Sequence, residues 1–299
     1  MQEQPEETIE LLSVALLDRH RTRVKTLKSL AHSLDLEFGW HYLLDLTWIL
    51  GRLGSVKGKG ILDAGAGTGI LQWYLAQEGA EVTSVDRVSR ANLPLRFRSR
   101  FKVKGFRKQD LLPSQMVFKS NFSGKEKWPV KWGHQVRDVA GLADPRREQG
   151  KVLIYNQDLK NLCDIPTDSL DAVVAVSALE HNPPEDLPLV VAELMRVLKP
   201  GGLLLASLNA ARDEDWWHAP SSGWCYTSES LRRLFDLPPE TPSNYECYDE
   251  FFAALRNCAE LRNGLARFYF RSDKNGMPWG KWDPQYIPVG VCKRKRPSV

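Results

Sequence analysis

The chain has 299 residues, of which 42% are hydrophobic and 26% are charged. This composition supports a sizeable core in one large or two small domains and excludes disordered, collagen-like and coiled-coil chains. The net charge of +4 does not favour a protein that coats nucleic acid. No apolar run approaches the roughly 18 residues of a membrane span, and the acidic N-terminus is unlike a signal peptide. Five cysteines without a CxxC pair favour neither a disulfide framework nor a zinc site, so we expect a cytoplasmic protein without bound metal.

Two segments near the N-terminus carry apolar residues at helical spacing, which predicts helices over residues 7–33 and 35–53. Gly54 ends the second segment, and the pattern changes after it. We therefore expect an N-terminal helical lid over residues 1–54, followed by a second domain over residues 55–299.

Beyond Gly54, short apolar runs alternate with helical patterns, as is typical of a parallel sheet with crossover helices. A helix is expected after the first run. A second is expected over about 186–198, where Lys199-Pro200-Gly201-Gly202 is a stop signal, and a third begins near Thr227, which is a cap. The predicted class is α/β, a doubly wound Rossmann-like fold with a seven-stranded, mostly parallel sheet and N-terminal helices. The predicted strands are 61–63, 81–86, 152–155, 171–176, 203–208, 266–271 and 286–292.

A basic insertion is predicted after the second strand, over about residues 87–150, because this stretch is too long for an ordinary connection. From Arg87 to Arg137 there are 14 Lys and Arg against Asp110 and Glu126, so this stretch carries +12 and the rest of the chain −8. Such a block creates a local field for an anionic group, or it is a solvated surface paired with acids elsewhere. The alternation of residues 96–104 also fits an amphipathic strand lying on a membrane or on RNA.

A glycine-rich turn follows the first predicted strand. Such a turn can seat a ligand against backbone N–H groups, and glycine permits the close approach and the left-handed backbone. Asp63 precedes the turn, and Asp86 ends the next strand, where a carboxylate can accept both hydroxyls of a ribose. The dinucleotide fingerprint requires a third glycine at the position of Ile70, but here that glycine comes one residue early, at Gly69. The turn therefore does not favour a pyrophosphate.

Five motifs carry a family resemblance, and they stand in this order: ILDAGAGTG at 61–69, Val85-Asp86, Gln157-Asp158-Leu159, DAVVAVSALEH at 171–181 and LKPGG at 198–202. Over roughly residues 55–235, apart from the basic insertion, the chain resembles class I S-adenosylmethionine-dependent methyltransferases. It is most similar to the small-molecule type that includes quinone-biosynthesis and sugar methyltransferases. Asn182-Pro183-Pro184-Glu185 lacks the final aromatic of the nucleobase-methylating signature, and we interpret it as a helix start.

The resemblance implies S-adenosylmethionine as the cofactor and a role for each matching residue. The turn glycines would pass under the methionine part, and Asp63 would organise its amino group. Asp86 would hold the ribose hydroxyls, Asp158 with the Leu159 backbone would face the adenine, and Ser177 would approach the methionine moiety. The turn glycines are Gly65, Gly67 and Gly69.

The acceptor side is less defined by the sequence. His181 and His218 are candidate bases, and the Trp-rich stretch 211–226 is a candidate acceptor pocket. If the basic insertion faces this pocket, the acceptor is anionic, such as a phosphorylated sugar, a carboxylated metabolite or a lipid head group. The alternatives are an RNA methyltransferase that uses residues 87–137 and a non-catalytic partner protein with the same fold.

Overall fold

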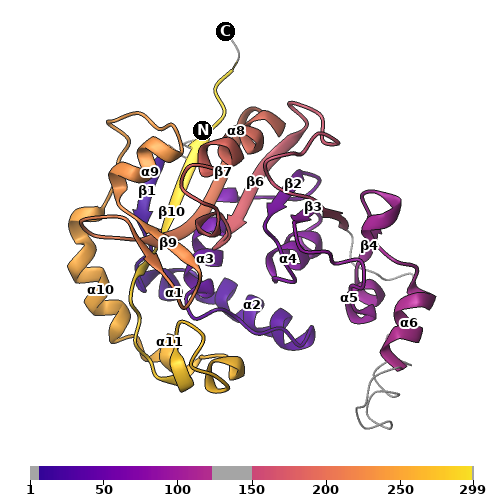
Figure 1. Cartoon of the computed structure of the whole chain (residues 1–299), viewed down its shortest axis with the longest axis horizontal. Helices are drawn as coiled ribbons and strands as arrows, with labels where there is room; N and C mark the ends of the chain where they lie inside the picture. The colour runs from indigo at the N-terminus through magenta and orange to yellow at the C-terminus, as the bar shows by residue number, and fades with distance from the viewer. Residues whose placement is uncertain (1–6, 123–149, 298–299) are drawn as a thin grey trace. The chain divides into compact units, whose positions relative to one another are not determined.

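The computed structural model describes residues 7–122 and 150–297. The chain forms two compact units (Figure 1). The small unit is Ser55–Leu162, and the large unit combines Met1–Gly54 with Cys163–Val299.

The small unit contains four parallel strands in the order β2-β3-β5-β4. The strands are β2 (Gly60–Ala64), β3 (Glu81–Asp86), β4 (Lys102–Gly105) and β5 (Lys151–Asn156). Its helices are α4 (Leu71–Gln77), α5 (Leu95–Arg100), the 3-10 turn η1 (Lys108–Asp110) and α6 (Ser114–Phe122). Asp86 at the end of β3 pairs with Asn156 at the end of β5. The carboxyl ends of these strands therefore lie at one edge, where ligands bind in open α/β sheets.

In the large unit, parallel strands β6 (Leu170–Val176) and β7 (Leu198–Ala210) are continued by antiparallel β10 (Ile287–Arg294) and β1 (Thr8–Leu11). Strands β8 (Trp216–His218) and β9 (Gly223–Tyr226) pair antiparallel, and β9 pairs parallel with β7. The helices are α1 (Ala15–Arg19), α2 (Arg21–Ser33), α3 (Tyr42–Leu53), α8 (Leu187–Val197), α9 (Ser228–Leu234), α10 (Tyr248–Arg256) and α11 (Ala259–Asn263). The 3-10 turns are η2 (Leu179–His181), η3 (Tyr245–Cys247), η4 (Arg267–Phe270) and η5 (Pro278–Gly280). Helix α3 contacts β6, β7 and β10, and buried leucines with Trp48 and Ile49 form this contact surface.

The predicted α/β class is confirmed, and the five strands and the helix predicted between residues 61 and 208 are present. The described residues form ten strands rather than the expected seven, because four short strands of three or four residues are added (β1, β4, β8 and β9) and the strand expected at 266–271 does not form. The late strand at 287–294 and the cap at Thr227 are also present, since the Thr227 side chain accepts a hydrogen bond from Ser230 N.

Three local predictions are wrong. Residues 7–33 begin with strand β1, because Thr8–Leu11 pairs with β10. The strand predicted at 266–271 is absent, because Arg267–Phe270 forms the 3-10 turn η4, in which only Tyr269 is buried. Residues 96–104 are a helix followed by a strand. Phe97 and Phe101, one helical turn apart, pack on Trp73 at ring distances of 4.7 and 5.1 Å.

We predict that Gly290→Ala lowers the unfolding free energy by about 1–3 kcal/mol, because a Cβ there would lie 2.5 Å from the buried ring of Trp48. Gly51→Ala in helix α3 is the matched control, since its nearest side-chain atom would be 3.6 Å away. Chemical denaturation measures both variants. A neutral Gly290→Ala would contradict this packing of α3 on β10.

Candidate functional site

The glycine turn leaves the end of β2 with two left-handed residues, Gly65 at φ +69° and Gly67 at φ +47°. Gly69 has an ordinary φ, but a Cβ there would lie 3.0 Å from the Ala66 carbonyl oxygen. Ala66 N donates to Val85 O at 3.0 Å, which ties the turn to β3. The backbone therefore requires glycine at positions 65 and 67 for conformation and at 69 for space.

Asp86 holds the turn from the end of β3. Its Oδ2 accepts a hydrogen bond from Gly67 N at 2.8 Å, and its Oδ1 accepts one from Val88 N at 2.7 Å. A carboxylate has about four lone-pair sites, so the half-buried Asp86 can accept further hydrogen bonds from a ligand.

Gln72, which the sequence analysis did not single out, lies in the first turn of helix α4 and bonds the glycine turn. Its buried Nε2 donates to the carbonyl oxygens of Gly69 and Gly67 at 3.0 and 3.3 Å, and its Oε1 accepts from Ser84 Oγ at 2.7 Å. Its partners lie in the glycine turn and on β3.

Asp63 and Arg90 are both buried near this turn, with 2% and 6% of their surfaces exposed. Burial raises the pKa of the Asp63 carboxyl to about 7, while Arg90 opposes the rise and Asp86 adds to it. Burial also lowers the pKa of the Arg90 guanidinium, and Asp86, Asp63 and Asp110 oppose that change. The small unit therefore contains a carboxyl group whose charge is poorly compensated.

Asp158 and Leu159 follow the end of β5 in the same unit. Asp158 is exposed, and its Oδ1 accepts a hydrogen bond from Lys160 N at 2.8 Å. Gln157 N donates to Asp86 O at 2.9 Å, so the segment that leads to Asp158 is tied to the end of β3. The small unit therefore brings the turn glycines, Asp63 and Asp86 together, and it places Asp158 two residues beyond the strand partner of Asp86.

The other three predicted site residues lie in the large unit. Ser177 follows β6 in a left-handed conformation, φ +45°, and its Oγ donates to Glu180 Oε1 at 2.5 Å. Glu180 is fully buried, and burial raises the pKa of its carboxyl. His181 is exposed, and its Nδ1 lies 2.7 Å from Ser222 O, so Nδ1 carries the proton and Nε2 is left as an acceptor.

His218 has different surroundings. It is 4% exposed, its Nδ1 lies 2.6 Å from Ser221 Oγ, and burial lowers the pKa of its imidazole. Nearby, Trp217 is 44% exposed and packs edge-on against Trp224 at 5.6 Å. The Trp-rich stretch thus supplies an exposed aromatic surface, whereas His218 is inside.

A buried histidine–aspartate pair in the large unit, His41 with Asp45, was not found by the sequence analysis. His41 Nδ1 lies 2.7 Å from Asp45 Oδ2, and both side chains are buried. The spacing of four residues on one helix is the signal that could have found the pair.

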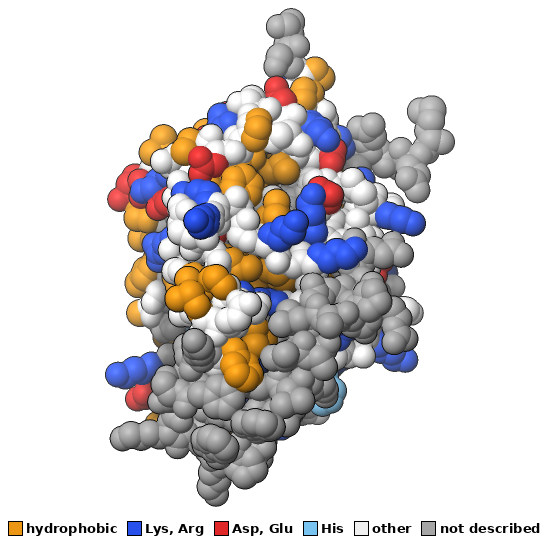
Figure 2. Space-filling model, turned by 90° about the vertical axis from the view of Figure 1, so that its right-hand side faces the viewer, with side chains coloured by type: hydrophobic (Ala, Val, Ile, Leu, Met, Phe, Trp, Pro, Cys, Tyr) orange, Lys and Arg blue, Asp and Glu red, His pale blue; other side chains and the backbone are white. Residues whose placement is uncertain are grey.

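Arg90 and Arg98 of the basic insertion are buried, whereas the sequence left open a field for an anionic group or a solvated surface paired with acids. Arg98 is 5% exposed and donates from Nε to Leu93 O at 3.0 Å and from Nη2 to Ala91 O at 3.1 Å. Figure 2 views the molecule from the side of β4 and α5 in Figure 1 and shows Lys and Arg side chains on this face. In residues 87–110 the fully exposed cations are Arg87, Lys102, Lys104 and Lys108. The predicted insertion residues 123–149 lie outside the described residues.

Within the described ranges 7–122 and 150–297, no helix has the length and apolar character of a membrane span. In these ranges no three His, Cys, Asp or Glu residues are grouped as metal ligands.

Comparisons with known proteins identify the family of the chain. The sequence model of a family described as a methyltransferase domain matches residues 42–237. The chain is 26% identical over 174 residues to a ubiquinone biosynthesis O-methyltransferase of Sodalis glossinidius, which covers 58% of this chain and 50% of the relative. It is 51% identical over 43 residues to the Photorhabdus laumondii protein of the same name, covering 14% of this chain and 18% of the relative. The chain thus spans half or less of the length of these curated relatives.

Among solved structures, the chain is similar to the Burkholderia thailandensis 1,6-didemethyltoxoflavin-N1-methyltransferase with bound 1,6-didemethyltoxoflavin and S-adenosylhomocysteine. The TM-score is 0.41 at 15% sequence identity, covering 95% of this chain and 85% of that one.

We predict that Asp63→Asn stabilises the ligand-free protein at about pH 8 by about 2–4 kcal/mol. Folding raises the pKa of Asp63 from 3.8 to about 7, so the free energy of unfolding falls as the pH rises between these two values. The side-chain amide of the Asp63→Asn variant does not ionise, so the variant does not lose this stability. The gain should vanish towards about pH 3, below the unfolded pKa of 3.8, where Asp63 is protonated in both states.

Denaturant titrations across this pH range measure the free energy of unfolding. Glu78→Gln is the control, because Glu78 is an exposed acid at the end of helix α4. An Asp63→Asn curve that runs parallel to that of the wild type would contradict the raised pKa.

Proposed function

The chain belongs to the methyltransferase-domain family, and from this premise we propose that it transfers a methyl group from S-adenosylmethionine to a hydroxyl group of a small molecule. The family match agrees with the class I S-adenosylmethionine-dependent resemblance of its motifs. The match over residues 42–237 is the observation that carries the proposal. The hydroxyl acceptor is supported by the relatives named as O-methyltransferases of ubiquinone biosynthesis.

The small unit contains the groups that would hold this cofactor. The left-handed Gly67 permits the close backbone approach that its methionine part needs, and Asp86 keeps lone pairs for the ribose hydroxyls. An ammonium group beside the buried Asp63 would offset the cost of charging that carboxyl, so the donor set fits an amino acid. Asp158 with Leu159 would face the adenine.

The cofactor supplies a methyl group on a sulfonium, which is already activated for displacement. The chain then has to orient the acceptor, exclude water and take the proton of its hydroxyl. His181 is better suited as the base than His218, because it is exposed and its Nε2 is left as an acceptor. Ser177 would approach the methionine moiety, as the family resemblance implies.

A small-molecule acceptor is better supported than RNA. Arg98 and Arg90 are used inside the fold, which leaves fewer cations of the basic insertion for a phosphate backbone. The proposal is tested by incubating the protein with methyl-labelled S-adenosylmethionine and either dihydroxybenzoates, sugar phosphates or bulk RNA. We expect a one-methyl mass gain on the phenol. Labelled RNA with unlabelled small molecules would contradict the proposal.

The cofactor site is tested by Gly67→Ala, with Gly58→Ala as its matched control. Both glycines are left-handed, at φ +47° and φ +74°, so each variant should lose about 1–2 kcal/mol of stability. A Cβ at Gly67 would lie 3.9 Å from Asp86 Oδ2, the carboxylate expected to hold the ribose, whereas a Cβ at Gly58 would have nothing within 4 Å, so only Gly67→Ala should lose S-adenosylhomocysteine binding in calorimetry. Equal affinities in the two variants would contradict this site.

His181→Gln should lower kcat about 100-fold on a phenolic acceptor, because the hydroxyl proton then has no positioned acceptor. The exposed His32→Gln in helix α2 is the control. Stopped-time assays at saturating cofactor measure both variants, and an unchanged kcat in His181→Gln would exclude it as the base.

A further inference from the structure

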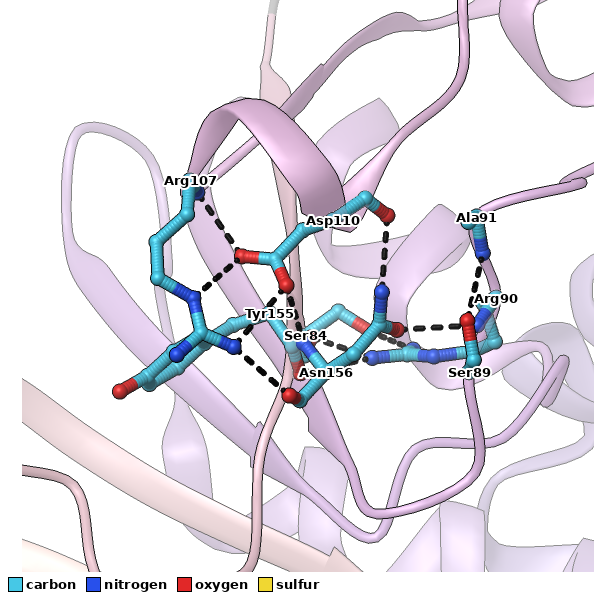
Figure 3. A network of polar contacts seen from close by, with 8 residues as sticks. All are labelled: Ser84, Ser89, Arg90, Ala91, Arg107, Asp110, Tyr155 and Asn156. Atoms are coloured by element: carbon cyan, nitrogen blue, oxygen red, sulfur yellow. Dashed lines mark hydrogen bonds and ion pairs between the residues drawn. The ribbon is translucent and has the colours of Figure 1, made fainter.

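We propose that Asp110, in the basic insertion, is a positioning residue for the adenosine part of the cofactor and acts through Asn156 and Arg90. This inference rests on the proposed function, because it concerns the same cofactor site. Figure 3 shows the three side chains in one continuous polar network.

Asp110 is the buried centre of the network, with 1% of its surface exposed. Its Oδ2 accepts from Arg107 N at 2.8 Å and from Arg107 Nε at 3.1 Å. Its Oδ1 accepts from Arg107 Nη2 at 3.1 Å and from Asn156 N at 3.2 Å. Four donors satisfy both oxygens, so the carboxylate is fixed in place and neutralised by one guanidinium.

Asn156 joins Asp110 to the strand end. Its Nδ2 donates to the Asp110 carbonyl oxygen at 2.9 Å, and Arg107 Nη2 donates to the Asn156 carbonyl oxygen at 2.8 Å. The Arg107 guanidinium also lies 4.7 Å from the ring centre of Tyr155. Because Asn156 is the register partner of Asp86, its position fixes the end of β5 beside the carboxylate expected to bind ribose.

Arg90 carries the network on to the glycine turn. Its backbone N donates to Asn156 Oδ1 at 2.9 Å, and its Nη1 donates to the Gly67 carbonyl oxygen at 3.1 Å. Its Nη2 donates to the carbonyl oxygens of Ser84 at 2.6 Å and Tyr155 at 3.3 Å. The backbone N of the same residue, Gly67, donates to Asp86 Oδ2 at 2.8 Å.

The chain of contacts therefore runs from Asp110 to Asn156, Arg90, Gly67 and Asp86 without leaving the small unit. Asp110 accepts from the backbone N of Asn156 at the end of β5, and Asn156 Oδ1 accepts from Arg90 N in the loop after β3. A shift of Asp110 would therefore move this strand end and this loop together. Residues 90–110 of the basic insertion would therefore hold the glycine turn and the end of β5 in place, through the bonds of Arg90 to Gly67 and of Arg107 to Asn156.

The test is calorimetric titration of Asp110→Asn with adenosine, S-adenosylhomocysteine and S-adenosylmethionine. The amide keeps the shape but loses the charge pair with Arg107, so we expect all three ligands to bind about tenfold more weakly at unchanged stoichiometry. Asn156→Ala should give a similar loss, and the double variant should lose less than the product of the two, because both act in one network.

Glu81→Gln is the matched control. Glu81 pairs with Lys151 at 2.6 Å, so this variant removes an ion pair between the same two strands, β3 and β5, at their opposite ends. It should bind all three ligands like the wild type.

Unchanged affinity in Asp110→Asn would overturn the inference while leaving the proposed function intact. A lower stoichiometry with an unchanged dissociation constant would also overturn it, because Asp110 would then support only folding. A wild type that binds none of the three ligands would overturn the proposed function and this inference with it.

Discussion

The glycine turn of the small unit is held by hydrogen bonds with the side chains packed against it, and the rest of the unit depends on this constraint. A turn with two left-handed glycines has no side chains of its own to fix it, so Gln72 and Arg90 bond its carbonyl oxygens and Asp86 bonds its amide. Arg90 can be buried only because three carboxylates oppose the loss of its charge. Asp63 is the member whose charge is least compensated, which is what a site for an ammonium group requires.

The same constraint explains the basic insertion. A stretch of +12 suggests a surface for anions, yet Arg90, Arg98 and Arg107 satisfy backbone carbonyls or a buried aspartate inside the fold. Their guanidinium groups can bond several carbonyl oxygens at once, which suits a loop that leaves a sheet edge without regular pairing. The net charge of a segment thus includes buried and half-buried arginines that already bond other groups of the protein.

Much of the fold was predictable because its signals are local. Runs such as 172–176 are apolar throughout, as buried parallel strands are, and the glycines at 65–69 stand directly after a run of this kind. Residues 8–11 were not predictable as a strand, since their partner lies nearly 280 residues later. Gln72, Asp110 and Glu180 were missed because each is an ordinary polar residue in the sequence, and only the fold shows that it is buried.

The central claim is that the glycine turn and Asp86 bind S-adenosylmethionine. It is tested most directly by titrating the purified wild type and Asp86→Ala with S-adenosylmethionine in a calorimeter, with circular dichroism to show that both are folded. We predict micromolar-range binding by the wild type at one site per chain, lost by at least about tenfold in Asp86→Ala. Equal binding by the two folded proteins, or none by the wild type, would contradict the account.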